Sequence, residues 1–154
     1  MGEFIEDKRH GWGLHVLKFG DRYKGQFEKD QMQGRGIYTF SKTSPQNGAA
    51  AGPGVQYFLG DLKENAFHGL GRMAFRDGTH YFGSFNNNCL QSERAIIKYA
   101  NGDTYKGGVQ QNMKSDPKEG KYIYANGDTY EGQFRGDRKD GEGKLLIAAQ
   151  HITY

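Results

Sequence analysis

The sequence predicts an all-β protein: an elongated, single-layer antiparallel meander of about six β-hairpin repeats, twisted so that one face forms an aromatic-lined groove. Three observations predict it. A five-residue pattern that alternates aromatic residues with glycine recurs, as in Tyr23–Phe27 and Tyr130–Phe134, each followed by a Gly-x-Gly pair. Turn-forming sequences such as Asn126-Gly127-Asp128 separate the copies. The chain also contains 24 glycines and 14% aromatic residues, which suits thin β-structure and argues against disorder.

The spacing of the pattern predicts the number of repeats. The glycine of the first strand recurs after 23, 35, 23, 24 and 25 residues, at Gly2, Gly25, Gly60, Gly83, Gly107 and Gly132. The long interval predicts an insertion of about a dozen residues, which we expect to form a loop. We therefore expect one array over residues 1–154, with repeats at about 1–22, 23–54 (insertion 42–54), 55–79, 80–104, 105–129 and 130–154.

The second repeat shows why aromatic residues alternate with glycine. Residues two apart in a strand share a face, so Tyr23, Gly25 and Phe27 point to one side, with Gly36 and Tyr38 beside them on the next strand. Glycine in a strand interior is costly, but an aromatic ring lying over it from a neighbouring strand compensates. We therefore expect the glycines to be seats for the Tyr and Phe rings.

The other repeats follow this plan with local departures. Residues 11–19 read as the second strand of the first repeat, and Phe58–Leu62 opens the third. In the fourth repeat, Ser92 and Arg94 stand where the glycine pair is expected, which predicts altered ring seats. The fifth has Lys118 in place of the first glycine of the pair. The apolar tail, residues 145–154, is compatible with a further strand, a short helix or a severed seventh repeat.

The combined pattern Tyr-x-Gly-x-Phe, Gly-x-Gly and Asn-Gly-Asp-x-Tyr resembles MORN repeats (membrane occupation and recognition nexus), and this resemblance covers almost the whole chain. The resemblance implies a linear adaptor in cytoskeletal, ciliary or membrane-apposed assemblies, with self-association in several members. It also implies phospholipid binding as a second role. A third implied role is that of a regulatory module in a larger enzyme, although no methyltransferase or lipid-kinase domain lies in these residues.

The ring face is the first candidate binding site. Aromatic rings are favoured anchors at protein interfaces, so an extended or helical peptide of a protein partner could lie along the groove. The residues expected to line it are Tyr23, Phe27, Phe58, Tyr81, Phe85, Tyr105, Tyr130 and Phe134.

Basic loops are the second candidate site, for anionic phospholipid. Acidic residues stand beside each basic group and would partly cancel the attraction. The candidate residues are Lys8, Arg9, Arg135, Arg138 and Lys139.

The sequence argues against several other classes of protein. No nucleophile, base and acid converge by spacing, so we expect no catalysis, and the recurrence of His10 and His68 just before a glycine pair favours a structural or loop role for both. No set of residues has metal-ligand spacing, and we expect no metal and no cofactor. The net charge of +3 is too balanced to indicate nucleic acid. A single cysteine, Cys89, and no secretory or transmembrane segment favour a cytoplasmic protein, with cytoskeletal or membrane association as an open alternative.

Overall fold

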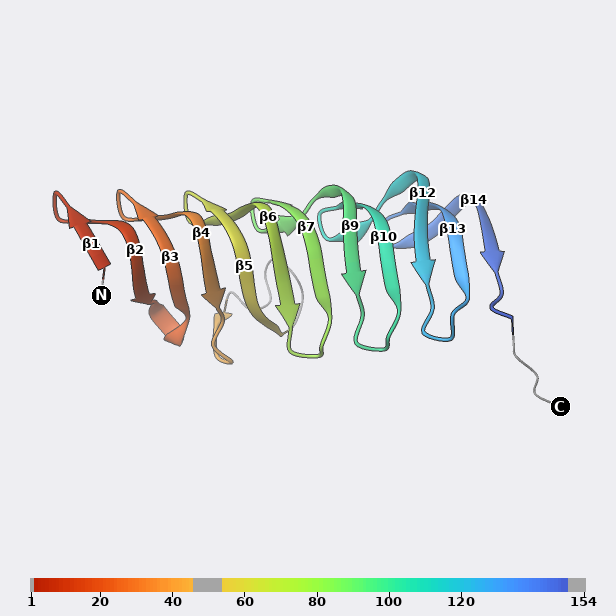
Figure 1. Cartoon of the computed structure of the whole chain (residues 1–154), viewed down its shortest axis with the longest axis horizontal. Coiled ribbons are helices and arrows are strands. Elements are labelled where there is room, and N and C mark those ends of the chain that lie inside the picture. Colours follow the sequence, from red (N-terminus) through yellow and green to blue (C-terminus); the bar gives the residue numbers. More distant parts are fainter. Residues whose placement is uncertain (1, 46–53, 150–154) are drawn as a thin grey trace.

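The computed structural model describes residues 2–45 and 54–149, and they form one long antiparallel sheet (Figure 1). Strands pair in chain order, and two short strands, β8 and β11, pair with β7 and β10 beside this path. The strands are β1 (Gly2–Ile5), β2 (Lys8–Val16), β3 (Arg22–Glu28), β4 (Gln31–Thr39), β5 (Val55–Lys63), β6 (Ala66–Phe75), β7 (His80–Asn86), β8 (Cys89–Leu90), β9 (Ser92–Lys98), β10 (Thr104–Gln110), β11 (Met113–Lys114), β12 (Asp116–Ile123), β13 (Thr129–Arg135) and β14 (Arg138–Leu146).

The predicted all-β meander is therefore confirmed, and the sheet is open, with β1 and β14 at opposite ends (Figure 1). One 3₁₀ turn, η1 (Lys18–Gly20), stands between β2 and β3. Most of the predicted insertion, residues 46–53, lies outside the described residues. The tail forms strand as far as Leu146, and residues 150–154 also lie outside them.

Each hairpin closes through a two-residue turn in which both residues have positive φ, the geometry of a type I′ turn. The second position holds Asp or Asn, which adopt this left-handed conformation more readily than other non-glycine residues. The turn pairs are Glu6-Asp7, Lys29-Asp30, Glu64-Asn65, Asn87-Asn88, Gln111-Asn112 and Gly136-Asp137.

The wider turns connect one hairpin to the next, and several of them contain glycine in an Asn-Gly or Asp-Gly sequence. Gly78, Gly102 and Gly127 have φ of 97°, 93° and 93°, as the Asn-Gly and Asp-Gly sequences predicted. The tight turns escaped prediction because only one of them contains glycine.

A row of glycines crosses the ring face of the sheet. Gly25 pairs with Gly13 and with Gly36, and the row continues through Gly60 and Gly71. A Cβ at Gly36 would overlap the ring of Tyr23, a Cβ at Gly71 the ring of Phe58, and a Cβ at Gly143 the ring of Tyr130. The prediction that these glycines are ring seats is confirmed.

In the fourth repeat the predicted position of the glycine substitutes was wrong. The register pairs Gly107 with Ala95, so Ala95 occupies the glycine row, and neither Ser92 nor Arg94 does. The shift arises because the ladder is interrupted between β8 and β9, where the Gln91 amide donates to the Ser84 carbonyl. A buried methyl group therefore replaces the glycine, and Leu90 lies against Gly83.

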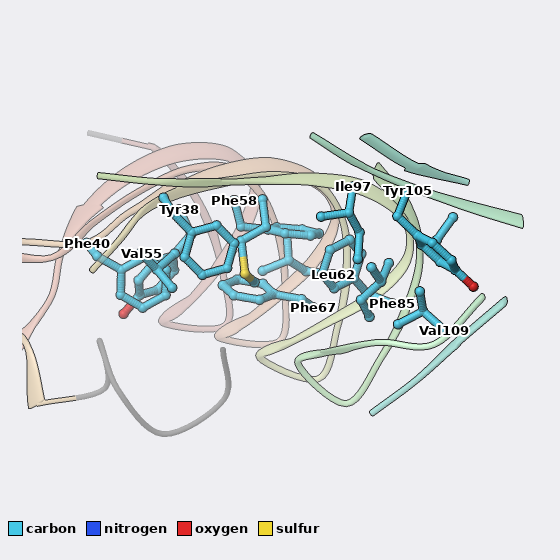
Figure 2. Close-up of a cluster of buried hydrophobic side chains, with 14 of the residues drawn as sticks. Tyr38, Phe40, Val55, Phe58, Leu62, Phe67, Phe85, Ile97, Tyr105 and Val109 are labelled. Carbon is cyan, nitrogen blue, oxygen red and sulfur yellow. The ribbon is translucent and has the colours of Figure 1, made fainter. Parts of the chain in front are cut away.

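The hairpins bend just after the glycine row, and this bend makes the core. The register shifts between Gly25 and Phe27, between Gly60 and Leu62, and between Gly132 and Phe134. A bulge bends a strand and strengthens its twist. Figure 2 shows the ribbon curving around the buried side chains, in which neighbouring aromatic rings pack together with aliphatic side chains such as Leu62 and Ile97.

Candidate interaction surfaces

The rings predicted to line an open groove lie inside the bent sheet. Seven of the eight are 0–9% exposed and belong to the hydrophobic core, while Tyr81 is half-buried and packs against Phe75. The expectation of an exposed aromatic lining was wrong, because the hairpin ends fold back over the rings after the bulge. The buried seven are Tyr23, Phe27, Phe58, Phe85, Tyr105, Tyr130 and Phe134.

The tyrosines of this set also bond to the bulge. The hydroxyl of Tyr23 donates to the carbonyl of Gln26 at 2.9 Å, and that of Tyr105 donates to the carbonyl of Gly108 at 2.8 Å. Burial raises the pKa of Tyr23 to about 12, despite an opposing effect of this hydrogen bond. Burial, followed by the charge of Asp116, raises the pKa of Tyr105. These hydroxyls satisfy carbonyls of the bend, which is a structural role.

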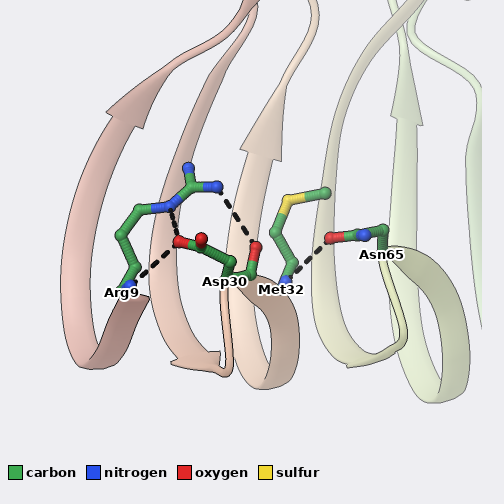
Figure 3. A network of polar contacts seen from close by, with 4 residues as sticks. All are labelled: Arg9, Asp30, Met32 and Asn65. Carbon is green, nitrogen blue, oxygen red and sulfur yellow. Dashed lines mark hydrogen bonds and ion pairs between the residues drawn. The ribbon is translucent and has the colours of Figure 1, made fainter. Parts of the chain in front are cut away.

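A second repeated contact joins five of the six tight turns to the preceding hairpin. The second turn residue accepts a hydrogen bond on its side chain from a backbone amide in that hairpin and returns one from its own amide to the same residue's carbonyl. Figure 3 shows two of these contacts: Arg9 with Asp30 at 2.9 Å, and Met32 with Asn65 at 2.8 Å. Three more follow, pairing Phe67 with Asn88, Leu90 with Asn112 and Lys114 with Asp137.

The wide turns carry a corresponding contact toward the following repeat. Asp103 accepts hydrogen bonds from the Tyr122 hydroxyl at 2.7 Å and the Ala125 amide at 2.8 Å. The Tyr122 bond, opposed by desolvation, lowers the pKa of Asp103. Asn101 shapes the turn itself by accepting from the Asp103 amide. The Asp103 side chain therefore joins one repeat to the next.

Lys114 is held in a ring cluster that no sequence pattern indicated. Its ammonium lies 5.5, 6.0 and 5.9 Å from the ring centroids of Tyr99, Tyr105 and Tyr122, and bonds to the Tyr99 hydroxyl. Desolvation lowers the pKa of Lys114, but the hydroxyl and Asp137, 3.2 Å away, raise it more, so the pKa is above its ordinary value. The Lys114 cation therefore finds its hydrogen-bond and charge partners within the chain.

Three of the five candidate lipid-binding residues are similarly engaged. Arg9 pairs with Asp30 and lies over the Phe27 ring, and Arg135 pairs with Asp140 at 3.1 Å. The Lys139 ammonium contacts the Tyr124 hydroxyl and lies 4.6 Å from the Tyr130 centroid. The remaining two residues, Lys8 and Arg138, are exposed near the tight turns.

The opposite face of the sheet, which we call the outer face, is open to solvent. The registers align many of its side chains in two rows that run from β2 to β14, together called the outer rows. A shorter line beside the first row includes Trp12, Gln26 and the ion pair of Arg35 with Asp61. The first row is Leu14, Lys24, Ile37, Leu59, Arg72, Phe82, Ile96, Lys106, Lys121, Glu131 and Lys144. The second row is Val16, Arg22, Thr39, Tyr57, Ala74, His80, Lys98, Thr104, Ile123, Thr129 and Leu146.

The outer rows have an uneven charge. They hold seven of the chain's 21 basic residues but one of its 18 acidic residues, Glu131, which is paired with Lys121 at 2.9 Å. Exposed apolar side chains stand between the cations, including Leu14 at 52%, Leu59 at 49% and Ile96 at 36%. Two of these cations, Lys24 and Lys106, were visible in the sequence, because they stand between the Tyr and the Gly of the repeat pattern, where alternation places them on this face. The basic residues are Arg22, Lys24, Arg72, Lys98, Lys106, Lys121 and Lys144.

The described residues also bear on metal binding and membrane insertion. In residues 2–45 and 54–149, no group of three or more His, Cys, Asp or Glu side chains is placed to hold a metal. The same ranges contain no helix of the length and hydrophobicity needed to cross a membrane.

An open array of β-hairpins, joined by rings seated on glycines and by turn side chains that bond to the next hairpin, defines a linear β-repeat protein. The family model for the MORN repeat matches residues 1–14, 23–44, 58–80, 119–129 and 130–148, more than half of the chain. The chain belongs to the MORN-repeat family, whose arrays are generally non-catalytic interaction and scaffold modules. The unmatched stretch between residues 80 and 119 contains the departures at Ala95 and Lys118.

Comparison with curated proteins finds no match. Among solved structures, the chain is similar to the TCP domain of SAS-4 (dCPAP) of Drosophila melanogaster, solved in complex with a proline-rich motif of Ana2 (dSTIL). The two share 13% sequence identity with a TM-score of 0.47, over 88% of this chain and 71% of that chain. A likeness of this degree carries no conclusion about partners.

Proposed function

We propose that this chain is a non-catalytic scaffold that binds a protein partner on the outer face of its sheet. The observation that carries the proposal is the exposed apolar set in one row, with Leu14, Leu59 and Ile96 between 36% and 52% exposed. Apolar side chains gathered on one face of a soluble fold commonly mark interaction sites. The cytoskeletal or membrane-apposed setting rests on the family alone.

The ring cluster, first expected to hold a partner peptide or helix, supports the proposal less well. A partner that touched Tyr105 or Tyr130 would have to displace the hairpin ends that cover them, because these rings are 0% and 9% exposed. We therefore assign the rings to holding the array together and place the partner on the outer face.

Affinity capture from a cell lysate tests the proposal with matched baits. The test bait carries Leu14→Ser, Leu59→Ser and Ile96→Ser, and the control bait carries Phe4→Ser, Ile5→Ser and Met113→Ser, which are also exposed. We expect a protein that the wild-type and control baits retain and the test bait loses. Equal retention by all three folded baits would place the partner elsewhere.

Binding of anionic phospholipid through the basic loops is a weaker second candidate. Only Lys8 and Arg138 among its five residues are exposed without a contact described above, and two cations near a surface contribute roughly 2 kcal/mol. Such binding should fade as salt is raised. Binding to vesicles that ignores both salt and lipid charge would exclude this candidate.

Self-association and a regulatory role in a larger enzyme are two further proposals, each with less support than the outer face. Self-association would use β1 and β14, each of which pairs with one strand within the described residues. An unpaired strand edge is a template for another chain. The role as a regulatory module of a larger enzyme concerns domains beyond these residues and rests on the family alone.

A further inference from the structure

Arg72 lies half-buried at the centre of the outer rows, between two aromatic rings. Its guanidinium carbon is 5.9 Å from the Tyr57 ring centroid and 5.3 Å from the Phe82 centroid. Its Nη2 atom donates to Nδ1 of His80 at 3.2 Å, while its buried Nε has no partner in the described part of the chain. None of the described carboxylates forms an ion pair with Arg72.

A guanidinium in this position is prepared for a carboxylate. Removing a cation from water without a counter-charge is costly, so an arriving carboxylate would recover part of that cost. Beyond the bond from Nη2 to His80, the planar guanidinium keeps N–H donors on Nη1 with no acceptor in the described part of the chain, and a carboxylate is a fitting acceptor for them. His80 accepts from Arg72 as the neutral imidazole, and burial, then the charges of Arg72 and Lys98, lowers the pKa of His80, while Asp77 opposes them.

The charges around Arg72 favour the same kind of ligand. The Lys98 ammonium also lies over the Phe82 ring, 5.8 Å from its centroid, and Lys106 stands one strand beyond Ile96. The one acidic residue of the outer rows, Glu131, is far along the sheet on β13 and is paired with Lys121. A ligand on β6, β7, β9 and β10 therefore meets positive charge interleaved with apolar side chains.

We infer that the outer rows bind an acidic protein segment that carries apolar side chains between its carboxylates. This inference rests on the proposed scaffold function and names the class of its partner. One carboxylate pairs with Arg72 between Tyr57 and Phe82, others pair with the exposed lysines, and the apolar side chains pack on Leu59 and Ile96. Charge complementarity also speeds the encounter of the two chains.

The dimensions of the outer rows suit a short segment. Ten paired strands from β3 to β14 at about 4.8 Å spacing span about 40 Å, which an extended chain covers with roughly a dozen residues. The apolar side chains lie among longer lysine and arginine side chains rather than on protruding loops. A peptide can reach them there, whereas a lipid headgroup layer would use only the cations.

Direct binding to a defined probe tests the inference. The probe is a fluorescent peptide of about a dozen residues built from Glu-Glu-Leu triplets. The outer variant carries Lys24→Gln, Lys98→Gln and Lys106→Gln, all at exposed positions, and the control variant carries Lys8→Gln, Lys29→Gln and Arg138→Gln. Both variants lose the same charge. Vesicles of phosphatidylserine with phosphatidylcholine are tested in parallel.

We expect the peptide to bind the wild-type chain, the outer variant to bind it about tenfold more weakly, and the control variant to stay within about threefold of wild type. Arg72→Gln should also weaken binding, with the folded state checked by its melting temperature. Equal losses in the two triple variants would overturn the inference, since they would indicate net charge alone. Anionic vesicles binding through the outer rows without peptide binding would also overturn it, in favour of a membrane.

The two proposals fail in different ways. If the serine bait loses its captured partner while the outer variant keeps that partner and the acidic peptide does not bind, the scaffold stands and the acidic class of partner is wrong. If the serine bait and the outer variant both capture the same proteins as the wild type, but the acidic peptide binds as expected, then the outer rows recognise acidic segments. In that case the proposed packing of a partner on Leu14, Leu59 and Ile96 is wrong.

Discussion

The Asp30 side chain accepts a hydrogen bond at 2.9 Å from the backbone amide of Arg9, which lies 21 residues earlier in the chain. The Asp30 amide in turn donates to the Arg9 carbonyl at 3.1 Å. One turn residue thus makes both bonds that a neighbouring strand would make. Because the same pair of bonds recurs along this edge, it determines how each hairpin sits against the one before it.

Replacing Asp30 by alanine should destabilise the array, because the Arg9 amide loses its acceptor and alanine is strained at φ of 70°. Asp30→Asn should destabilise it less, because asparagine keeps the acceptor and tolerates the turn and loses only a partly exposed ion pair. Urea unfolding measures both variants. Equal destabilisation by the two substitutions would show that the charge of Asp30 stabilises the array and that its hydrogen bond with the Arg9 amide does not.

Replacing Gly36 by alanine should cost about 1–3 kcal/mol, since the new methyl group would overlap the ring of Tyr23. The cost should shrink in a Tyr23→Ala background, where the seat is empty. A double-mutant cycle by urea denaturation isolates this coupling. Additive effects of the two substitutions would contradict the packing of the Tyr23 ring on Gly36, because they would mean that the two positions do not interact.

Stability should fall as pH rises from about 10 to 12. Burial raises the pKa of both Tyr23 and Tyr81 from 10.0 to about 12, with nearby hydroxyl and carboxylate groups adding to the effect at Tyr81. A phenol with a raised pKa contributes stability that is complete below its unfolded pKa and is lost as pH approaches the folded value.

Tyr81→Phe separates this titration from hydrogen bonding. The Tyr81 hydroxyl has no hydrogen-bond partner in the described part of the chain, so the variant should keep its stability at neutral pH and show a shallower alkaline decline. Tyr23→Phe should also lose about 1 kcal/mol at neutral pH, with its bond to the Gln26 carbonyl. If the free energy of unfolding falls between pH 10 and 12 as steeply in both variants as in the wild type, neither phenol is buried.

Replacing Lys114 by methionine should change stability by less than about 1 kcal/mol. The corresponding position after other tight turns holds Met32 and Leu90, both buried, so an apolar chain of similar length fits the ring cluster. Lys114→Ala should cost about 2 kcal/mol or more because it leaves space beside Tyr105. Thermal melting compares the two, and a larger loss in the methionine variant would show that the Asp137 and Tyr99 contacts dominate.

Several features of the fold were predictable from sequence because they depend on neighbours close in the chain. The period of 23 to 25 residues predicted successive hairpins, and the two-residue alternation predicted which side chains share a face. Gly36 was predictable as a seat since Tyr23 lies on the adjoining strand of the same hairpin. The outer lysines were visible in the same alternation, although their alignment into rows required the register.

Other features could not be predicted because they depend on distant segments. The bulge after Gly25 and the hairpin end that follows it turn Phe27 inward, and burial of that ring needs neighbouring hairpins as well. Ala95 replaces the expected glycine only because the ladder is interrupted near Gln91. No local pattern distinguishes an Asp that shapes its own turn from one that bonds to a hairpin 21 residues away.

The sequence by itself therefore determined the class of repeat, the order of the strands and the division of side chains between two faces, since strand periodicity is a local property of the backbone. The tertiary structure decided which face is available to a partner. Bending at the bulges closes the ring face over its own aromatic side chains, because burying rings is more favourable than exposing them to water. The face that remains open is the basic one around Arg72.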